Sequence, residues 1–293
     1  MKPVLIIGCG YVGQRLARIL CGAGVAVTGV VRGAESAAAV RDLDAQALQV
    51  DLDAESDPPE LPTTNAELYY FAPPPGTGIS DPRLRRVLSA IRPETRPSRI
   101  VYISTSGVYG DCGGDWVDES HPLNPGTPRA LRRADAEAAL QAWSAASGVP
   151  VVILRVPGIY GPGKLPLERL RKGLPLLREE DSPYTNRIQV DDLIAICQAA
   201  MQRGIPGAAY NVSDGQPSNM TDYFNRIADV TGLPRPPVIG RDQIDQLSLG
   251  MRGFMEESKR LDTRRMREDL GVKLKYSTLE EGLKACLADV PLG

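Results

Sequence analysis

The first two-thirds of the chain alternates short aliphatic runs with longer amphipathic stretches, and this alternation restricts the possible folds more than any other feature. The aliphatic runs are VLII, VAVTGVV, ALQV, LYYFA, RIVYIS and VVILR. Helical periodicity lies between them, at residues 11–22, 34–43, 80–91 and 128–147. Strands rich in Val and Ile on both faces, separated by helices, predict a parallel sheet that is covered on both sides. Because crossovers between parallel strands are right-handed, we predict a doubly wound α/β fold.

The pattern changes after residue 162. Residues 163–187 are polar and interrupted by prolines, residues 190–203 form one more amphipathic helix, and AAYNVSD is typical of a further strand. The remaining sequence has short helical patterns and little strand signal. We therefore predict a sheet-containing domain of residues 1–162, to which residues 188–212 return. A smaller, mainly helical lobe for substrate binding would comprise residues 163–187 and 213–293.

Composition argues against several classes of function. The formal net charge is −2, so no overall field attracts nucleic acid or a membrane surface, and aromatic residues are scarce. The five cysteines show no CxxC spacing, and a single histidine, His121, argues against a zinc site. No apolar run is long enough to span a membrane. Free thiols in a chain of this size indicate a reducing compartment, and we expect a cytoplasmic protein.

The segment LIIGCGYVGQRLARIL places Gly8, Gly10 and Gly13 after the first strand and at the start of the first helix. Glycines with this spacing provide a tight turn, a close approach of backbone to pyrophosphate, and close packing of helix on strand. The amides of the helix N-terminus then face the anion. We predict a Rossmann-type dinucleotide site here; the alternative is a glycine-rich turn without a ligand.

Arg32 ends the second strand, about twenty residues beyond the glycines, where the choice between NAD and NADP is usually made. A carboxylate there binds the ribose 2′-hydroxyl of NAD, whereas an arginine can pair with the 2′-phosphate of NADP. Because VVRGA contains no carboxylate, we predict NADP, with NAD as the alternative. Asp51, at the end of the third strand, is expected near the adenine. The predicted cofactor-binding set also includes Tyr11, Val12, Ala72 and Pro157.

Three further motifs follow in order: STSGVYGD after the fifth strand, RVPGIYGPGK after the sixth, and NRIQVDDL at residues 186–193. Together with the glycine motif and RRMREDLGVKL, they resemble the extended short-chain dehydrogenase/reductase family, in particular its NAD-dependent epimerase/dehydratase branch. The resemblance covers nearly the whole chain. It implies a nicotinamide cofactor, often a nucleotide-linked sugar as substrate, and a possible homodimer formed through the helices at 80–91 and 128–147.

The chain departs from the active site of that family. Thr105 takes the place of the family's catalytic serine or threonine, with Ser104 and Ser106 beside it. The family's tyrosine acid/base and the lysine four residues later correspond to Arg129 and Arg133. A guanidinium stays protonated and has no acceptor atom, so Arg129 cannot take a proton from a substrate.

Site roles follow from this correspondence. We predict that Thr105 and Ser104 bind a substrate oxygen, that Arg129 polarises or clamps the substrate, and that Arg133 holds the cofactor ribose. The resemblance also implies that Arg187 contacts substrate phosphates, and the predicted substrate contacts are Ser106, Tyr109 and Arg187.

The arginines of TPRALRRADAE can be interpreted in two ways. Arg129, Arg132 and Arg133 share one face of the predicted helix and could together recognise an anion. Alternatively, Arg132 and Arg133 are solvated and pair with Asp135 or Glu137 along the helix.

Other proton donors have weaker support. Tyr109 and Tyr160 are expected to be packing residues, Cys112 has no visible base near it in the sequence, and His121 lies on a loop bounded by proline. Asp191 and Asp192 are expected to cap the next helix.

The leading interpretation is an NAD(P)-dependent oxidoreductase or epimerase/dehydratase-like enzyme with a non-standard acid/base, acting on a small polar or nucleotide-linked substrate. The alternative is a non-catalytic NAD(P)-binding sensor or scaffold protein. Neither nucleic acid nor a membrane is expected as a partner.

Overall fold

A computed structural model of the protein describes residues 1–54 and 60–288. Its central sheet has seven strands in the order β12-β7-β5-β4-β1-β2-β3, and every neighbouring pair is parallel. The strands are β1 (Val4–Ile7), β2 (Val27–Val31), β3 (Gln46–Gln49), β4 (Glu67–Tyr70), β5 (Arg99–Thr105), β7 (Val151–Val156) and β12 (Ala209–Asn211). The first six contain part of a predicted aliphatic run, β12 lies in the AAYNVSD segment that we expected to form a further strand, and the predicted parallel α/β sheet is confirmed.

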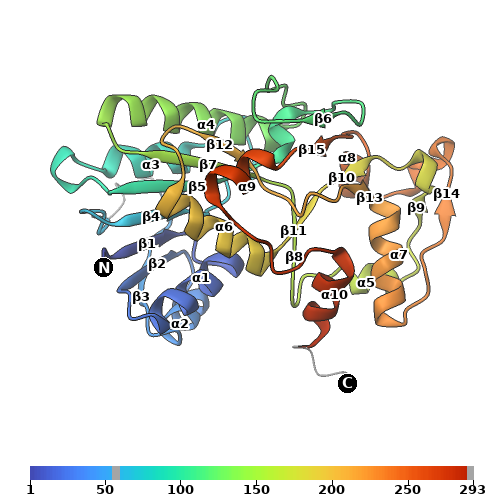
Figure 1. The fold of residues 1–293 in the computed structure, drawn as a ribbon, viewed down its shortest axis with the longest axis horizontal. Coiled ribbons are helices and arrows are strands. Elements are labelled where there is room, and N and C mark those ends of the chain that lie inside the picture. Colours follow the sequence, from blue (N-terminus) through green and yellow to red (C-terminus); the bar gives the residue numbers. More distant parts are fainter. Residues whose placement is uncertain (55–59, 289–293) are drawn as a thin grey trace.

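Helices cover both faces of the sheet (Figure 1). One face carries α1 (Tyr11–Gly22), α2 (Ala34–Arg41) and α6 (Val190–Arg203), whose buried side chains form one core cluster. The other face carries α3 (Pro82–Ala90) and α4 (Pro128–Ser147), which contribute to a second cluster. This two-sided arrangement is the doubly wound fold that the sequence predicts.

Strand β1 shows why its sequence is apolar at every position. Val4 and Ile6 pack into the cluster under α1 and α6, whereas Leu5 and Ile7 pack into the cluster under α3 and α4. Successive side chains of a strand point to opposite faces, so a strand covered on both sides has no position for a polar residue.

Helix α4 begins as its sequence predicts. The Thr127 hydroxyl oxygen accepts a hydrogen bond from the amide of Ala130 at 3.2 Å, and Pro128 occupies the first helical position. The helix ends at Gly148, whose φ of 74° favours glycine.

The prediction that Asp191 and Asp192 cap α6 is wrong. The side chain of Gln189 accepts the hydrogen bond from the Asp191 amide and caps the helix. The Asp192 carboxylate instead accepts from the amides of Lys275 at 2.6 Å and Tyr276 at 3.2 Å. Asp192 therefore anchors the loop that contains Lys275 and Tyr276 to α6.

Short elements fill the rest of the chain. Beside the sheet lie η1 (Pro93–Thr95), η2 (Ser106–Tyr109), β6 (Trp116–Val117), β8 (Gly158–Tyr160) and β11 (Arg187–Gln189). Before the last sheet strand come α5 (Leu167–Arg171), β9 (Leu176–Leu177), η3 (Glu179–Asp181) and β10 (Tyr184–Thr185). After it come β13 (Ser218–Asn219), α7 (Met220–Thr231), β14 (Val238–Ile239), η4 (Arg241–Gln246), α8 (Leu249–Phe254), β15 (Arg260–Leu261), α9 (Arg264–Leu270) and α10 (Leu279–Ala288).

A separate core cluster lies under α5, α7 and α10, with Leu170, Phe224 and Leu283 among its buried members. The preceding elements β15 and α9, at residues 260–270, pack elsewhere. Strand β15 pairs with β6, and Met266 and Leu270 of α9 pack into the cluster beside α6 and the sheet. The proposed boundary at residue 213 therefore does not follow the packing of this segment.

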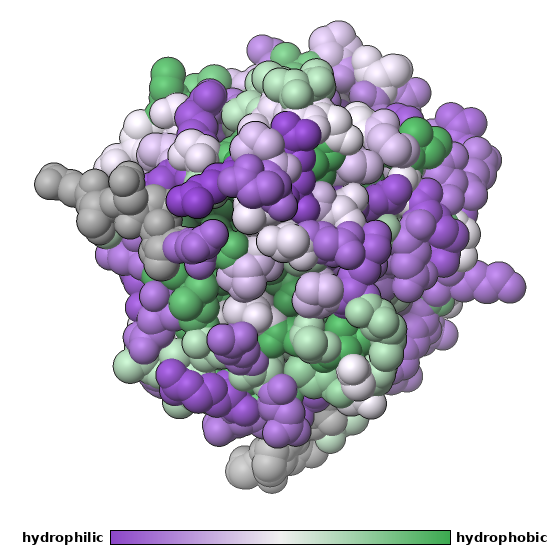
Figure 2. Space-filling model, turned by 90° about the vertical axis from the view of Figure 1, so that its left-hand side faces the viewer, coloured by the Kyte–Doolittle hydropathy of each residue, from purple (hydrophilic) through white to green (hydrophobic). Residues whose placement is uncertain are grey.

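The surface mixes polar and apolar side chains. On the face shown in Figure 2, hydrophobic patches are divided by hydrophilic side chains. None of the helices described is both long and apolar enough to cross a bilayer.

Candidate functional site

A pocket of about 380 Å³ opens at the carboxyl ends of β1 to β4. Five of the residues predicted to bind a cofactor lie on its wall: Gly8, Gly10, Arg32, Asp51 and Ala72. Ligands of open α/β sheets bind at this edge, because the loops after parallel strands converge there.

Each glycine of the first turn is required, or tolerated, for a different structural reason. Gly8 has a φ of 87°, and a Cβ atom there would collide with the backbone nitrogen of Ala72. At Gly13 a Cβ atom would lie 3.0 Å from the Ile6 Cγ2, so the glycine lets α1 pack closely on β1. Gly10 begins α1 without a side-chain cap and faces open space. The first turn of α1 has no acidic residue, which leaves its amides suited to an anion.

Tyr11, Val12, Gly13 and Pro157 are not on the wall of this pocket. The Tyr11 hydroxyl donates to the Pro162 carbonyl at 3.0 Å, and its ring lies 3.9 Å from the Arg15 guanidinium. Tyr11 thus ties α1 to the GIYGPGK loop, where a side chain at Gly161 would collide with its hydroxyl.

An ion pair that the sequence does not reveal lies at the same pocket. Arg83 of α3 donates from Nε to Asp53 Oδ1 at 2.7 Å and from Nη1 to the Pro73 carbonyl at 2.8 Å. The hydrogen bond from Arg83 lowers the pKa of Asp53. Both residues line the pocket, so they connect the loop after β3 with the start of α3. The only sequence signal is that Asp53 follows Asp51 in DLD after the third strand.

At the carboxyl end of β5, Thr105 begins η2, which packs against the first turn of α4. The Thr105 hydroxyl oxygen accepts from the Gly107 amide at 3.2 Å, and the side chains of Thr105 and Ser106 are half-buried. Ser104 is placed differently from the prediction. It is 3% exposed and donates to the Glu137 carboxylate, so its hydroxyl is turned into the protein and away from any substrate.

Two of the three arginines of α4 reach backbone carbonyls. Arg133 Nη1 donates to the Ile103 carbonyl at 2.8 Å and to the Tyr102 hydroxyl at 3.1 Å. Arg132 is 7% exposed and donates from Nη1 to the Gly78 carbonyl at 2.7 Å, while its buried Nε has no partner. Arg129 is exposed, and within residues 1–54 and 60–288 it has no hydrogen-bond or ion-pair partner. Neither Arg132 nor Arg133 forms an ion pair with Asp135 or Glu137, so the second of our two interpretations of the arginine cluster is wrong.

The acidic residues of α4 bind elsewhere. Asp135 accepts from the Arg85 guanidinium and from the Asp81 amide at 2.9 Å. Glu137 is 2% exposed and forms an ion pair with Arg155 of β7 at 2.9 Å, which is buried as well. The sequence contains both residues of this pair but gives no sign that they meet.

Tyr109 belongs to the same buried network, and the structure does not place it where a substrate could reach it. It is fully buried; its hydroxyl donates to Asn211 Oδ1 at 2.7 Å and accepts from Arg155 at 2.8 Å. Burial raises the pKa of Tyr109 to about 12, although Arg155 opposes the shift. Tyr109 is thus a packing residue that links β12 with β7.

The Cys112 Sγ lies 3.8 Å from His121 Nε2. A possible base, which the sequence does not reveal, therefore lies beside the thiol. The thiol is also 3.8 Å from the carbonyls of Tyr109 and Gly110. Burial raises the pKa of Cys112, which favours the neutral thiol. This environment suits a weak hydrogen-bond donor better than a thiolate nucleophile.

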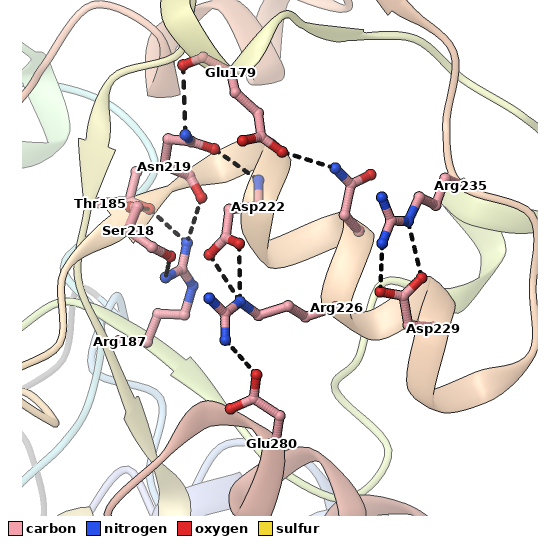
Figure 3. A network of polar contacts seen from close by, with 11 residues as sticks. Glu179, Thr185, Arg187, Ser218, Asn219, Asp222, Arg226, Asp229, Arg235 and Glu280 are labelled. Atoms are coloured by element: carbon pink, nitrogen blue, oxygen red, sulfur yellow. Dashed lines mark hydrogen bonds and ion pairs between the residues drawn. The ribbon is translucent and has the colours of Figure 1, made fainter.

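Arg187 lies in the interior of the smaller lobe (Figure 3). It is 5% exposed, donates to the hydroxyls of Ser218 at 2.8 Å and Thr185 at 2.6 Å, and lies over the Tyr223 ring at 4.2 Å. Burial lowers the pKa of its guanidinium. Since these donors already bind protein oxygens, the predicted contact with substrate phosphates is not supported by this arrangement.

The remaining contacts in Figure 3 hold the lobe together. Arg226 of α7 binds Asp222 one turn earlier and Glu280 of α10, so it joins the two helices. Arg235 and Asp229 form an exposed pair at 2.8 Å.

Comparison with known proteins adds to this geometry. Residues 83–213 match the NAD dependent epimerase/dehydratase family. Human dTDP-D-glucose 4,6-dehydratase is 30% identical over 134 residues, which cover 43% of this chain and 38% of that enzyme. The matched region is thus well under two thirds of the human enzyme.

Two solved structures resemble the whole chain. A functionally unknown conserved protein from Silicibacter pomeroyi is 33% identical, with a TM-score of 0.85 and coverage of 99% of both chains. UDP-glucuronic acid 4-epimerase from Bacillus cereus in complex with NAD shares the fold at 19% identity, with a TM-score of 0.75 and 97% coverage of both chains. The parallel sheet, the glycine turn at its carboxyl edge and these matches lead to one conclusion: residues 83–213 resemble the NAD dependent epimerase/dehydratase family, and the whole chain has the fold of the Silicibacter pomeroyi protein and of the Bacillus cereus epimerase.

Proposed function

We propose that the protein is an NAD(P)-dependent oxidoreductase or epimerase/dehydratase-like enzyme that works without a tyrosine acid/base. The main support is the pocket of about 380 Å³ into which the Gly8–Gly10 turn opens. A dinucleotide fits the residues present there, because Gly8 cannot carry a side chain and Gly10 leaves the first amides of α1 uncovered. The Bacillus cereus epimerase, which has the same fold, is a complex with NAD.

Each part of the cofactor has a suitable group on the pocket wall. The amides after Gly10 would hold the pyrophosphate, and Asp51 would lie near the adenine ribose. Arg32 and Ser36 both line the pocket and would bind a 2′-phosphate, which is why we favour NADP over NAD. When bound, the nicotinamide supplies a hydride acceptor or donor.

The proton step would not involve the usual pair of side chains. In our alignment by motif, Arg129 and Arg133 occupy the positions of the family's tyrosine and lysine. Thr105 accepts a hydrogen bond from the Gly107 amide, which leaves its own hydroxyl hydrogen free to donate to a substrate oxygen. Arg129 would hold the substrate but cannot move a proton.

Substitution of Arg32 tests the cofactor. We expect calorimetry to show the wild-type protein binding NADPH more tightly than NADH, and Arg32→Glu to reverse that order by removing the 2′-phosphate contact and offering a carboxylate to the 2′-hydroxyl. A tenfold loss of NADPH affinity corresponds to about 1.4 kcal/mol. Ser36→Ala, on the same wall, should weaken NADPH less. If the wild-type protein binds none of NAD, NADH, NADP and NADPH, the proposal fails.

The second candidate is a non-catalytic NAD(P)-binding sensor or scaffold. The motif correspondence favours it, because it assigns Arg129 and Arg133 to the two positions where the family transfers a proton and holds the ribose. Two negative results would support this candidate: bound NADP+ that is never reduced by dTDP-glucose or UDP-glucose, and bound NADPH that is never oxidised by small carbonyl compounds. Cofactor binding should then change assembly with other proteins instead. Homodimerisation, the cytoplasmic location and the two-part domain division stay predictions.

A further inference from the structure

The N-terminus of α4 carries more positive charge than its surroundings balance. Arg129, Arg132 and Arg133 lie within its first two turns, and the first turn contains no acidic residue. The helix N-terminus adds a partial positive charge of its own. Such an arrangement is unfavourable in the free protein unless carboxylates compensate for it.

Three of the nearby carboxylates are paired with cations outside the cluster. Glu257 is the acidic residue whose field most favours the charged form of Arg129, and it binds the ammonium of Lys259 at 2.7 Å. On α4 itself, Asp135 binds Arg85 and Glu137 binds Arg155. Each of these three carboxylates thus has a cation outside the cluster. The positive charge of Arg133 also acts on buried Asp81 and opposes the rise that burial causes in the pKa of that carboxyl. The charge left without a nearby counter-ion is therefore chiefly that of Arg129.

The three arginines differ in how much hydrogen-bonding capacity they retain. Arg132 and Arg133 each give a nitrogen to a carbonyl, of Gly78 and Ile103, and this fixes their position. Arg129 has no partner among the residues that the structure describes, and the buried Nε of Arg132 has none. The exposed guanidinium of Arg129 therefore keeps its planar set of donors for two oxygen atoms on one anion.

Arg129 also lies beside other cations and protein groups. Desolvation by the surrounding protein, followed by repulsion from Arg133 and Arg132, lowers the pKa of its guanidinium. Ala130, its neighbour in α4, lies against η2, because a Cβ atom at Gly107 would be 3.6 Å from the Cβ of Ala130. Position 129, at the start of α4, therefore lies next to η2, which directly follows Thr105.

We propose that this arginine cluster is an anion site, in which Arg129 binds a carboxylate or phosphate group of the substrate. This group would lie close to the carbon whose oxygen accepts the hydrogen bond from Thr105. A neutral sugar ring in this place would leave the Arg129 guanidinium without a counter-ion. The substrate class that fits is a small hydroxy or oxo acid, or its phosphorylated counterpart. That the anion belongs to the substrate rests on the proposed function; that the cluster binds an anion does not.

The site is tested without dinucleotide, by thermal unfolding and calorimetry at low ionic strength. Malonate serves as the carboxylate probe and inorganic phosphate as the phosphate probe. We expect one of them to bind saturably to the wild-type protein and to raise its Tm. Arg129→Gln should weaken that binding at least tenfold while leaving the Tm without anion unchanged or higher, because it removes an uncompensated charge. Arg129→Lys keeps the charge but loses the planar fork, so it should bind with intermediate affinity.

Arg18→Gln is the matched control, since Arg18 is an exposed arginine on α1, away from the cluster. It should bind the probe like the wild type. Protection of Arg129 from phenylglyoxal by the probe, mapped by mass spectrometry on the wild-type protein, gives a readout that requires no variant to fold. Equal binding by the wild type and Arg129→Gln, or no saturable binding of either probe, would overturn the proposal. A separate NADPH titration shows whether the cofactor proposal stands in either case.

Discussion

At the scale of single residues, burial decides what a polar side chain does. Ser104, Tyr109 and Arg187 have the residue types of a binding site, but each is buried and bonded to protein atoms. Their partners Glu137, Asn211 and Ser218 are all at least 31 residues away in sequence. Sequence can predict the Thr127 cap, whose partner is three residues on, because the contact is local. It cannot predict contacts that depend on how strands and helices meet.

Asp214 gives a prediction at this scale. It is 6% exposed, and burial raises its pKa to about 6, although the Gln216 amide, Arg187 and Arg267 oppose the shift. Because the folded pKa lies above the unfolded value, the favourable contribution to stability is complete below about pH 4 and is lost as pH rises through about 6. Asp214→Asn should therefore be more stable than the wild type at pH 7 by up to about 3 kcal/mol.

Urea unfolding of both proteins at several pH values measures this difference. The two stabilities should converge as pH falls toward 4, where the wild-type carboxyl is protonated. A difference that stays the same from pH 4 to pH 7 would show that Asp214 is not desolvated as the structure indicates.

At the scale of elements, the long helices could be predicted from the sequence and the shortest strands could not. Helices α4 and α6 have the residue ranges that their periodicity predicts, Pro128–Ser147 and Val190–Arg203. The two-residue strands β9 and β10 were not predictable, because two residues carry no period. They form by pairing with β14 and β13, which lie tens of residues further along the chain.

The ion pair between Glu137 and Arg155 connects α4 with β7 and supports a prediction about these elements. Both side chains are buried, so removing one partner leaves a buried charge unpaired. We expect Glu137→Ala to lower the free energy of unfolding by about 3–5 kcal/mol and Glu137→Gln to lower it by less. Glu168→Ala removes one partner of the exposed pair with Lys172 and should change stability by no more than about 0.5 kcal/mol. Equal effects of Glu137→Ala and Glu168→Ala in urea unfolding would contradict the structural role of the buried pair.

At the scale of the whole molecule, the fold class followed from the alternation of strands and helices, whereas the path of the C-terminal segment did not. Met266 and Leu270 lie in a sequence that reads as part of the smaller lobe, but they pack beside α6 and the sheet. Short helices can join either core, and only the tertiary structure shows which one they join.

This packing predicts that the two parts unfold together. Leu270 is fully buried in the core beside the sheet, so Leu270→Ala should cost about 2–5 kcal/mol. The loss should appear as one cooperative transition, because α9 and the sheet share a core. Calorimetry that shows an unchanged main transition and a separate, weakened minor one would place α9 outside the sheet's cooperative unit.

The return of α9 to the sheet also has a consequence during synthesis. The nascent chain exposes the apolar side of α6 until residue 270 has left the ribosome, because Met266 and Leu270 cover part of it. The glycine turn at Gly8 and Gly10 is thus made before α9, yet the scaffold behind it is completed only when α9 is present. A translation product that stops short of α9 should be recognised by chaperones and proteases as unfinished, even though it contains every residue on the wall of the pocket beside β1 to β4.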